Sequence, residues 1–318
     1  MGELIFVEGA PGTGKSTTAQ FLARQLARAG RRARWIYEEE AANPLVPQAP
    51  AGGYRSWDDF VAARVERWQT VAAELAASDE TIVAESALLQ LPVFSMLRRN
   101  AEQGTIEQLV NRLVHAVERV HPRLVYLAHA DPARAWRAIA ARRGTAFVAS
   151  AIARSDESPF AHARGLAGLD AVLTYWRAHT DVCDHIVSWL PMRTLSLDSA
   201  AGPWAERRRR ICTFLGLAAD EPLPPPAAEL APLTGRYGDA SQDVTIALGE
   251  GGLVLRGALW PTNALLPVAP DVFDVEAWPF RVTFARDGHG EVETLRWDGP
   301  RLHWGGPAGV YRRLGGAS

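Results

Sequence analysis

The chain contains little lysine, little cysteine and no long apolar run, and each of these features excludes certain classes of protein or of binding site. Lys15 is the only lysine in a sequence with 34 basic residues of the Lys and Arg types. Two cysteines, Cys183 and Cys212, give neither a disulfide framework nor a C-x-x-C zinc pattern, so a reducing cytoplasm is the expected setting. No apolar run approaches the ~18 residues of a membrane-spanning helix, and the first strand pattern leaves no room for a signal peptide, so no membrane contact is expected.

The chain also lacks a strong net charge. Its formal charge is −2 at pH 7, so no global basic surface favours nucleic acid or an anionic membrane as a partner. The 8 histidines include no pair at the spacing of a metal motif such as H-E-x-x-H. With 318 residues the chain is long enough for two domains of about 100 to 200 residues each.

The single lysine lies in a glycine-rich stretch, FVEGAPGTGKSTT, that begins at Phe6. This stretch fits G-x-x-x-x-G-K-[ST], the phosphate-binding loop. An apolar strand pattern, Leu4 to Glu8, precedes it and a helical pattern follows it, which is the context in which backbone N–H groups and a helix N-terminus converge on phosphate oxygens. The residues expected to bind the nucleotide phosphates are Gly9, Pro11, Gly12, Thr13, Gly14, Lys15, Ser16 and Thr17.

A chemical requirement explains why lysine is kept at this one position. An ammonium on a flexible stem reaches between the β- and γ-phosphates as a compact point charge, whereas a planar guanidinium needs a wider, forked geometry. Lys15 is therefore a predicted catalytic residue as well as a phosphate ligand, and the Ser16 hydroxyl is a predicted ligand of Mg²⁺.

Short apolar runs alternate with longer helical patterns through the first two-thirds of the chain, which is typical of an α/β fold with a parallel sheet. Ser56 and Asp59 form a capping-box pattern at the start of one helix, whose outer face carries Arg64 and Arg67. Asp131 and Pro132 are suited to begin another helix. Two more helices are expected over 168–189 and 204–215. The expected strands are Leu4 to Glu8, Arg34 to Tyr37, Thr81 to Ala84, Leu124 to Ala128 and Thr194 to Leu197.

A proline-rich segment, DEPLPPPAAELAP from Asp220 to Pro232, interrupts this alternation and favours an extended spacer. We therefore expect a first domain over residues 1–217, a linker over 218–232 and a small antiparallel, barrel-like β domain over 233–318. Five strands are predicted in the β domain, namely Val244 to Leu248, Leu253 to Arg256, Arg281 to Ala285, Glu291 to Trp297 and Arg301 to Trp304. Its tryptophans Trp260, Trp278, Trp297 and Trp304 either line an apolar pocket or form core.

Acidic residues follow two of the expected parallel strands. Glu85 ends the third strand, where ligands bind in parallel sheets, and is predicted to lie near Mg²⁺ or to act as a base; the alternative is a cap for the next helix. Glu38, Glu39 and Glu40 end the second strand. At least one, with Glu38 as the candidate, is expected to face the phosphate loop and to accept a proton from an attacking hydroxyl; the alternative is a solvated acidic loop.

Arginines supply the charge that phosphoryl transfer needs. Arg142 and Arg143 precede Gly144 at a helix end, where a mobile lid is expected to close over ATP, and Arg154 and Arg164 flank the next loop. For each of them an ordinary surface arginine is the alternative. The run Arg207 to Arg210 winds around a helix, so it is interpreted as a solvated face.

These motifs resemble the small P-loop kinases, such as thymidylate kinase and related nucleotide or small-molecule kinases, over Gly2 to Leu217. The resemblance implies a five-stranded parallel sheet in the order 2-3-1-4-5 and places the loop Asp198 to Pro203 near the adenine. The third strand ends in Glu85-Ser86, where thymidylate kinases carry Asp-Arg, which puts a thymidylate acceptor in doubt. The stretch from LTGRYGD to VYRRL is similar to lipocalin-like β domains.

The sequence thus predicts an ATP- and Mg²⁺-dependent kinase that transfers the γ-phosphate to a hydroxyl or phosphate of a small-molecule acceptor. Its predicted catalytic residues are Lys15, Glu38, Glu85, Arg142 and Arg143, and Ser16 and Glu85 are its predicted metal ligands. Two alternatives stay open: an NTP-hydrolysing regulator with a partner-binding β domain, and a polynucleotide 5′-hydroxyl kinase. No N-K-x-D run favours GTP, and the charge does not favour a polynucleotide.

Overall fold

The computed structural model describes residues 1–318 except 1, 49, 52, 220–224, 241 and 315–318. It divides into two units. The first contains Met1–Glu38 and Asn43–Ala219, and the second contains Glu39–Ala42 and Asp220–Ser318. Each unit is described by itself.

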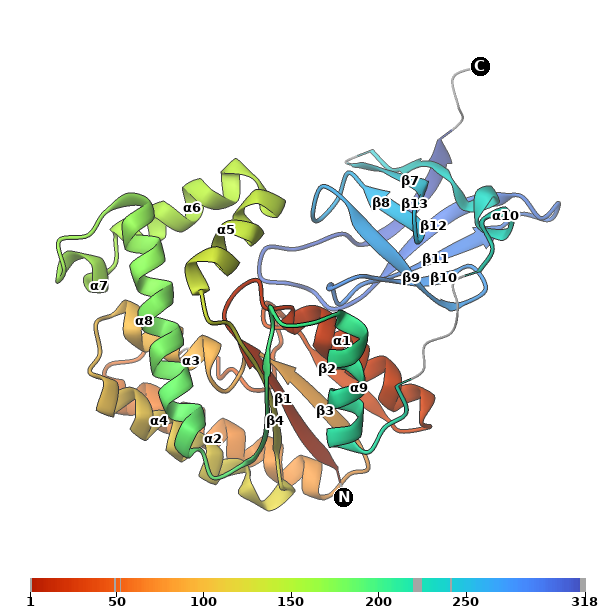
Figure 1. Ribbon diagram of the computed structural model, residues 1–318. Coiled ribbons are helices and arrows are strands. Elements are labelled where there is room, and N and C mark those ends of the chain that lie inside the picture. The colour runs from red at the N-terminus through yellow and green to blue at the C-terminus, as the bar shows by residue number, and fades with distance from the viewer. Residues whose placement is uncertain (1, 49, 52, 220–224, 241, 315–318) are drawn as a thin grey trace. The chain divides into compact units, whose positions relative to one another are not determined.

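The first unit is built on a five-stranded parallel sheet in the order β2-β3-β1-β4-β5 (Figure 1). This confirms the predicted α/β class and strand order. Val7 of β1 lies opposite Glu85 of β3, and Gly9 lies opposite Leu127 of β4, so the three central strands end at one edge. The strands are β1 (Glu3–Gly9), β2 (Ala33–Ile36), β3 (Thr81–Glu85), β4 (Arg123–Ala128) and β5 (Arg193–Asp198).

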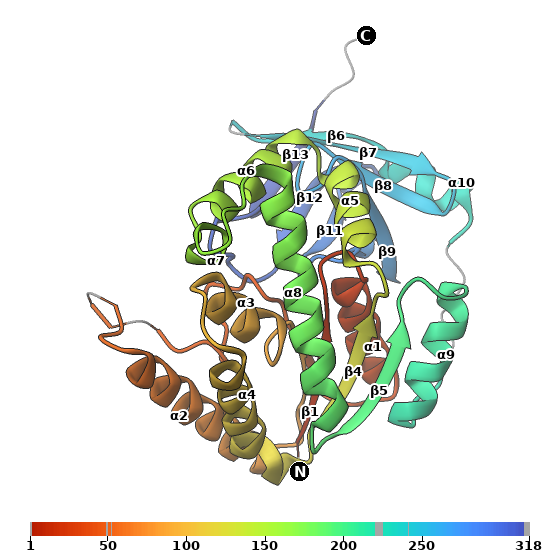
Figure 2. The ribbon, with the colours of Figure 1, turned by 60° about the vertical axis from the view of Figure 1, so that its left-hand side comes forward.

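Helices cover both faces of the sheet (Figure 1). One face packs on α1 (Lys15–Arg28) and α9 (Trp204–Leu215). The other packs on four helices, and Figure 2 shows the long α8 running beside α3 and α4. These four are α2 (Trp57–Ala76), α3 (Gln90–Arg98), α4 (Gln103–Val117), which continues into η1 (Glu118–Val120), and α8 (Gly168–Trp189).

The alternation of side chains along each strand decides which face a residue serves. Ile5 and Val7 of β1 belong to the core under α1, whereas Leu4 and Phe6 belong to the core under α2 and α8. Glu8 therefore continues the α2 face. By the same count Glu85 of β3 lies on the α1 face, next in line after Val83.

Both predicted helix starts are confirmed. The Ser56 hydroxyl accepts from the Asp59 amide at 3.1 Å at the start of α2, and Asp131 accepts from the Arg134 amide at 3.0 Å at the start of α5. α5 (Pro132–Arg143), α6 (Thr145–Asp156) and α7 (Pro159–His162) follow β4. Trp136 of α5 stacks on Phe147 of α6 with 6.2 Å between the ring centroids, so the predicted lid region is helical and shares a small apolar core with α8.

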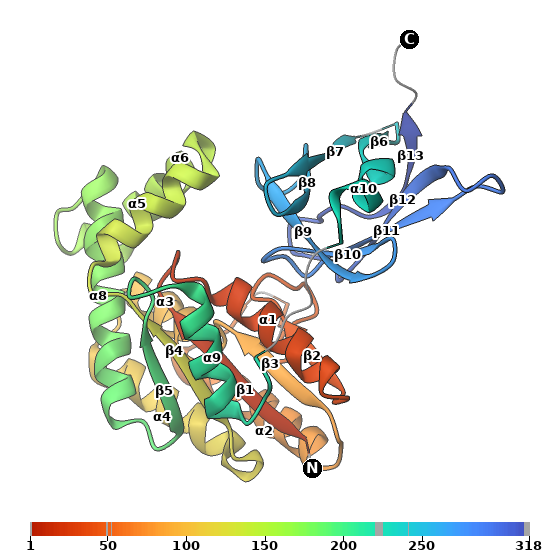
Figure 3. The same cartoon turned by 45° about the vertical axis from the view of Figure 1, so that its right-hand side comes forward.

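The second unit contains a closed eight-stranded antiparallel barrel, as Figure 3 shows. This confirms the expected barrel-like β domain. The barrel core is filled by aromatic and branched side chains, including Tyr237, Phe273 and Phe284. The strands are β6 (Gly235–Gly238), β7 (Asp243–Gly249), β8 (Gly252–Arg256), β9 (Asn263–Ala269), β10 (Val272–Val275), β11 (Arg281–Arg286), β12 (Val292–Asp298) and β13 (Gly309–Leu314).

One predicted strand is wrong and four strands were missed. Residues 301–304 form no strand; Leu302 only makes isolated bridges, to Glu40 and to Gly305. The missed strands are β6, β9, β10 and β13, which are short or carry glycine or proline and so give weak alternating patterns. In the expected linker, residues 220–224 lie outside the described part, and Ala227–Leu230 form a helical turn, α10, followed by η2 (Ala231–Leu233), where an extended chain was expected.

Candidate nucleotide-binding site

The phosphate loop joins β1 to α1, as the sequence predicts. Gly14 has φ 91° and precedes α1, whose N-terminus receives no hydrogen bond from a capping side chain. The first-turn N–H groups of a helix have no acceptor within the helix, so those of α1 are suited to an anion. Pro11, Ser16 and Thr17 are half-buried beside the loop, and the Thr13 hydroxyl donates to the Ala10 carbonyl at 2.8 Å.

Two glycines are required here by space as well as by backbone angle. A Cβ on Gly9 would lie 2.5 Å from the Leu127 carbonyl oxygen of β4. On Gly12, which has φ 86°, it would lie 2.9 Å from the Ala135 carbonyl oxygen of α5. The loop is therefore held directly against β4 and α5.

Lys15 and Ser16 bring the predicted chemistry together. Lys15 is buried, and its ammonium donates to the Ala10 carbonyl at 3.2 Å. The Ser16 hydroxyl donates to Glu85 Oε1 at 2.5 Å, and the Trp35 indole donates to Glu85 Oε2 at 3.1 Å. The structure thus joins the two predicted metal ligands, Ser16 and Glu85, in one contact.

Glu85 is a buried acid whose surroundings favour its protonated form. Burial and the nearby Glu38 raise its pKa to about 8, against the opposing effects of Lys15 and of the hydrogen bonds from Ser16 and Trp35. A hydroxyl paired with a carboxylate suits Mg²⁺, which keeps several waters and takes few protein ligands. The described residues contain no cluster of three or more His, Cys, Asp or Glu side chains suited to a metal.

A second group of polar side chains lies on the α2 face of the same sheet edge. Glu8 is fully buried, and its carboxylate accepts from the Leu88 amide at 2.6 Å and from the Gln90 amide at 3.0 Å, at the start of α3. Burial raises the pKa of Glu8 to about 7 against these hydrogen bonds. The acid that caps the helix after β3 is therefore Glu8, whereas Glu85 accepts from α1 and β2.

Glu38 is the member of the predicted acidic trio that joins this group. The Gln90 side-chain amide donates to its Oε2 at 2.8 Å. Glu39 and Glu40 belong to the second unit, where the Trp304 indole donates to Glu39 at 2.7 Å and Glu40 bridges to Leu302.

His179 and Cys183 of α8 complete the α2 face and were not singled out from the sequence. His179 Nε2 lies 3.3 Å from the Gln90 carbonyl oxygen, and Cys183 Sγ lies 3.7 Å from His179 Nδ1. Burial lowers the pKa of His179 to about 4 and raises that of the Cys183 thiol, so both groups are neutral at pH 7. The signal for Glu8 was in the sequence, as an acid ending an apolar strand; α8 gave only a helical apolar pattern.

The predicted arginines lie on the helices after β4. Arg142 is exposed in the last turn of α5, and Arg143 lies 5.0 Å from the centroid of the Phe147 ring. Arg164 lies over Phe160 and donates to Asn100 at 2.6 Å, so it is tied to its own surroundings. Arg207 donates to the Ser199 carbonyl and lies over Trp204, so it packs against its neighbours where a solvated face was expected.

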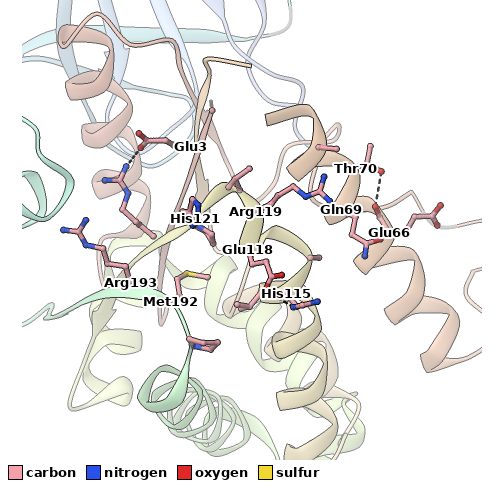
Figure 4. Close-up of a pocket in the computed structure, with 18 residues that line it drawn as sticks. Glu3, Glu66, Gln69, Thr70, His115, Glu118, Arg119, His121, Met192 and Arg193 are labelled. Atoms are coloured by element: carbon pink, nitrogen blue, oxygen red, sulfur yellow. Dashed lines mark hydrogen bonds and ion pairs between the residues drawn. The ribbon is translucent and has the colours of Figure 1, made fainter. Parts of the chain in front are cut away.

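A pocket at the other edge of the sheet contains none of the predicted site residues. It lies at the amino ends of β1, β4 and β5, where Glu3 pairs with Arg123 (Figure 4). Parallel sheets bind ligands at the carboxyl ends of their strands, so this pocket is not the nucleotide site.

Across the described residues, no helix has the length and apolar character needed to span a membrane.

Comparisons with known proteins add the following. A family model described as an AAA domain matches residues 1–158. No curated protein matches the chain. The YorR protein of Bacillus subtilis, solved with phosphorylated GDP, is 14% identical, with 67% of this chain and 95% of that chain covered and a TM-score of 0.38. A sugar kinase from Janibacter sp. is 16% identical, with 69% and 97% covered and a TM-score of 0.36. The AAA match, which covers just under half of the chain, agrees with the P-loop type of fold that the phosphate loop and the parallel sheet give the first unit.

Proposed function

We propose that this protein is an ATP- and Mg²⁺-dependent phosphotransferase that moves the γ-phosphate to a hydroxyl or phosphate group of a small molecule. The observation that carries the proposal is that two groups of polar side chains lie at one edge of the sheet, one on each of its faces. Lys15, Ser16 and Glu85 serve the α1 face, and Glu8 and Glu38 serve the α2 face. Hydrolysis needs only a water molecule, whereas a second set of buried polar groups supports a second substrate.

The α1 face would bind the donor. Lys15 and the amides of Gly12 to Ser16 are suited to hold the β- and γ-phosphates, and Ser16 with Glu85 would hold Mg²⁺, directly or through water. The ion would neutralise phosphate charge when bound. Because Glu85 lies against the Ser16 hydroxyl, a cation there favours the ionised form of the carboxylate and opposes the effect of burial.

The α2 face would orient the acceptor. Glu38 is half-buried, and its hydrogen bond from Gln90 holds the carboxylate at the sheet edge. In this proposal Glu38 accepts the proton of an attacking hydroxyl, and Arg142 or Arg143 stabilises the charge on the transferred group as the α5–α7 segment closes.

The AAA-domain match keeps one other function in view, an ATPase that uses the same loop to activate water. The separating experiment offers γ-labelled ATP and Mg²⁺ to the full chain together with a metabolite extract and a panel of nucleosides, nucleotides and hydroxylated small molecules. We expect a labelled organic product that is lost in Lys15→Arg and falls about 100-fold or more in Glu38→Gln.

Label released only as inorganic phosphate, at the same rate with and without the extract, would overturn the kinase proposal in favour of the ATPase. Glu74→Gln, which removes an exposed carboxylate of α2, is the matched control for the loss of one acid and is expected to keep full activity.

A further inference from the structure

Arg64 of α2 is a buried cation whose charge nothing in the described chain balances. Its side chain is 5% exposed. Among the described residues no carboxylate forms an ion pair with it, and its buried Nε has no hydrogen-bond partner. The sequence pattern placed it on the outer face of α2, and the structure corrects that position. Burial lowers its pKa to about 10, so it remains charged at pH 7.

The immediate neighbours of Arg64 are aromatic. Its guanidinium carbon lies 5.5 Å from the centroid of the Phe60 ring, and the Tyr54 ring meets the same Phe60 ring edge-on at 5.4 Å. The Tyr54 hydroxyl is also buried without a described hydrogen-bond partner. A cation–π contact recovers only part of what a guanidinium loses on leaving water. Two unpartnered donors therefore lie around one ring.

The packing of α2 on β1 places Arg64 toward the carboxyl ends of the parallel strands. The Gly2 amide donates to the Leu75 carbonyl at 2.9 Å, and Phe6 stacks on Trp68 at 5.4 Å, so α2 runs antiparallel to β1. Arg64 is one helical turn before Trp68, about 6 Å along the axis, and Glu8 is two strand residues after Phe6, about 6.6 Å along β1. Arg64 is therefore closer than Trp68 to the carboxyl ends of the strands, the edge at which Glu8 lies.

Further unpartnered polar atoms occur at this edge. Ser86, directly after β3, is fully buried, has φ 60°, and its hydroxyl has no described partner. Gln90 donates to Glu38, but its own Oε1 is buried without one. Buried polar groups are nearly always hydrogen-bonded, so these atoms are available to donate to or accept from a ligand at this edge.

We propose that Arg64, with the Tyr54 hydroxyl beside it, binds an anionic group of the phosphoryl acceptor, so that the acceptor is a phosphate monoester or a carboxylate rather than a neutral alcohol. The identification of the ligand as the phosphoryl acceptor rests on the proposed function, whereas the anion site itself does not depend on phosphoryl transfer. A guanidinium fork matches both anions in a bidentate manner, and a bound anion supplies the charge that the fold leaves uncompensated.

The test separates this anion site from the phosphate loop by working in full-length Lys15→Ala protein. Inorganic phosphate and acetate are titrated separately, with thermal unfolding and calorimetry as readouts. We expect one of them to bind and raise the melting temperature, and to bind at least about tenfold more weakly when Arg64→Met is added. Arg112→Met, which removes an exposed arginine of α4, is the matched control and should change nothing.

Phosphate binding alone would identify a phosphate monoester acceptor, and acetate binding alone a carboxylate. Arg64→Lys keeps the charge without the fork and should bind with intermediate affinity, which keeps the test decisive if Arg64→Met does not fold. The proposal is overturned if neither anion binds the Lys15→Ala protein, or if binding is equal with and without Arg64. Failure of the kinase assay with an intact Arg64-dependent anion site would instead overturn only the proposed function.

Discussion

Glu85 shows at the scale of one residue how a buried carboxyl group lowers the stability of the fold as pH rises. Its raised pKa, about 8 against an ordinary 4.5, means that the folded protein holds a proton that the unfolded chain releases above pH 4.5. Stability is therefore lost progressively between about pH 4.5 and 8, and the loss is constant above that range.

The prediction is that Glu85→Gln stabilises the nucleotide-free protein increasingly as pH rises from 5 to 8, by on the order of 4 kcal/mol at the upper end. Thermal unfolding of both proteins at pH 5, 6.5 and 8 measures this. A difference between them that does not change with pH would contradict the assignment.

Gly12 makes a second prediction at this scale. Gly12→Ala places a methyl 2.9 Å from the Ala135 carbonyl at a positive φ, and Gly144→Ala has a similar φ of 85° but no atom within 4 Å. Both pay backbone strain of about 1 kcal/mol, and Gly12→Ala must in addition shift the phosphate loop from α5. We expect at least a tenfold loss of nucleotide affinity in Gly12→Ala alone, measured by calorimetry with Mg·ATP.

The sequence predicted the residues whose role follows from a motif or from a strand end. Lys15, Ser16 and Glu85 belong to that group, and the structure brings Ser16 and Glu85 into contact. Arg64 was assigned by helical spacing to the face of α2 opposite the apolar residues, and nothing in the local sequence shows that its charge is buried. Gln90 was missed because its bond to Glu38 joins residues 52 positions apart in sequence.

At the scale of elements, α2 has a capped N-terminus and a buried face. The contribution of the cap to stability can be measured separately from that of the buried face. The Ser56 hydroxyl accepts from the Asp59 amide at the exposed N-terminus, whereas the Thr70 hydroxyl, on the same helix, donates back to the Glu66 carbonyl at 3.0 Å. Ser56→Ala should destabilise the protein by about 1 kcal/mol. Thr70→Ala should be neutral or slightly stabilising, because alanine is the better helix former. Urea unfolding of the two variants tests the opposite signs.

Helices and strands were predicted correctly where a periodic pattern of apolar residues or a capping residue marks them in the local sequence. All five parallel strands and the helices α2, α5, α8 and α9 lie where the sequence placed them. In the barrel the pattern is weaker. β9 contains Pro267, and β13 begins at Gly309 and pairs with β6, which is distant along the chain.

At the scale of the whole molecule, the second unit includes four residues from the loop after β2. The Ala41 amide donates to the Arg301 carbonyl at 2.9 Å, the His303 amide donates to the Glu39 carbonyl at 3.0 Å, and Glu40 bridges to Leu302. A fragment of residues 225–318 lacks all of these contacts. We expect it to melt several degrees lower than the same fragment supplied with a peptide of residues 36–45.

A peptide of the same composition in scrambled order is the control. Identical melting with either peptide would show that the segment contributes nothing to the barrel unit.

This discontinuity bears on how such a gene arises. A β domain encoded by one continuous segment of a gene is expected to fold by itself, and recombination can transfer it to another gene as a single piece. Here the second unit includes four residues that are encoded within the first, so a cut between the two units would separate the β domain from part of its own structure.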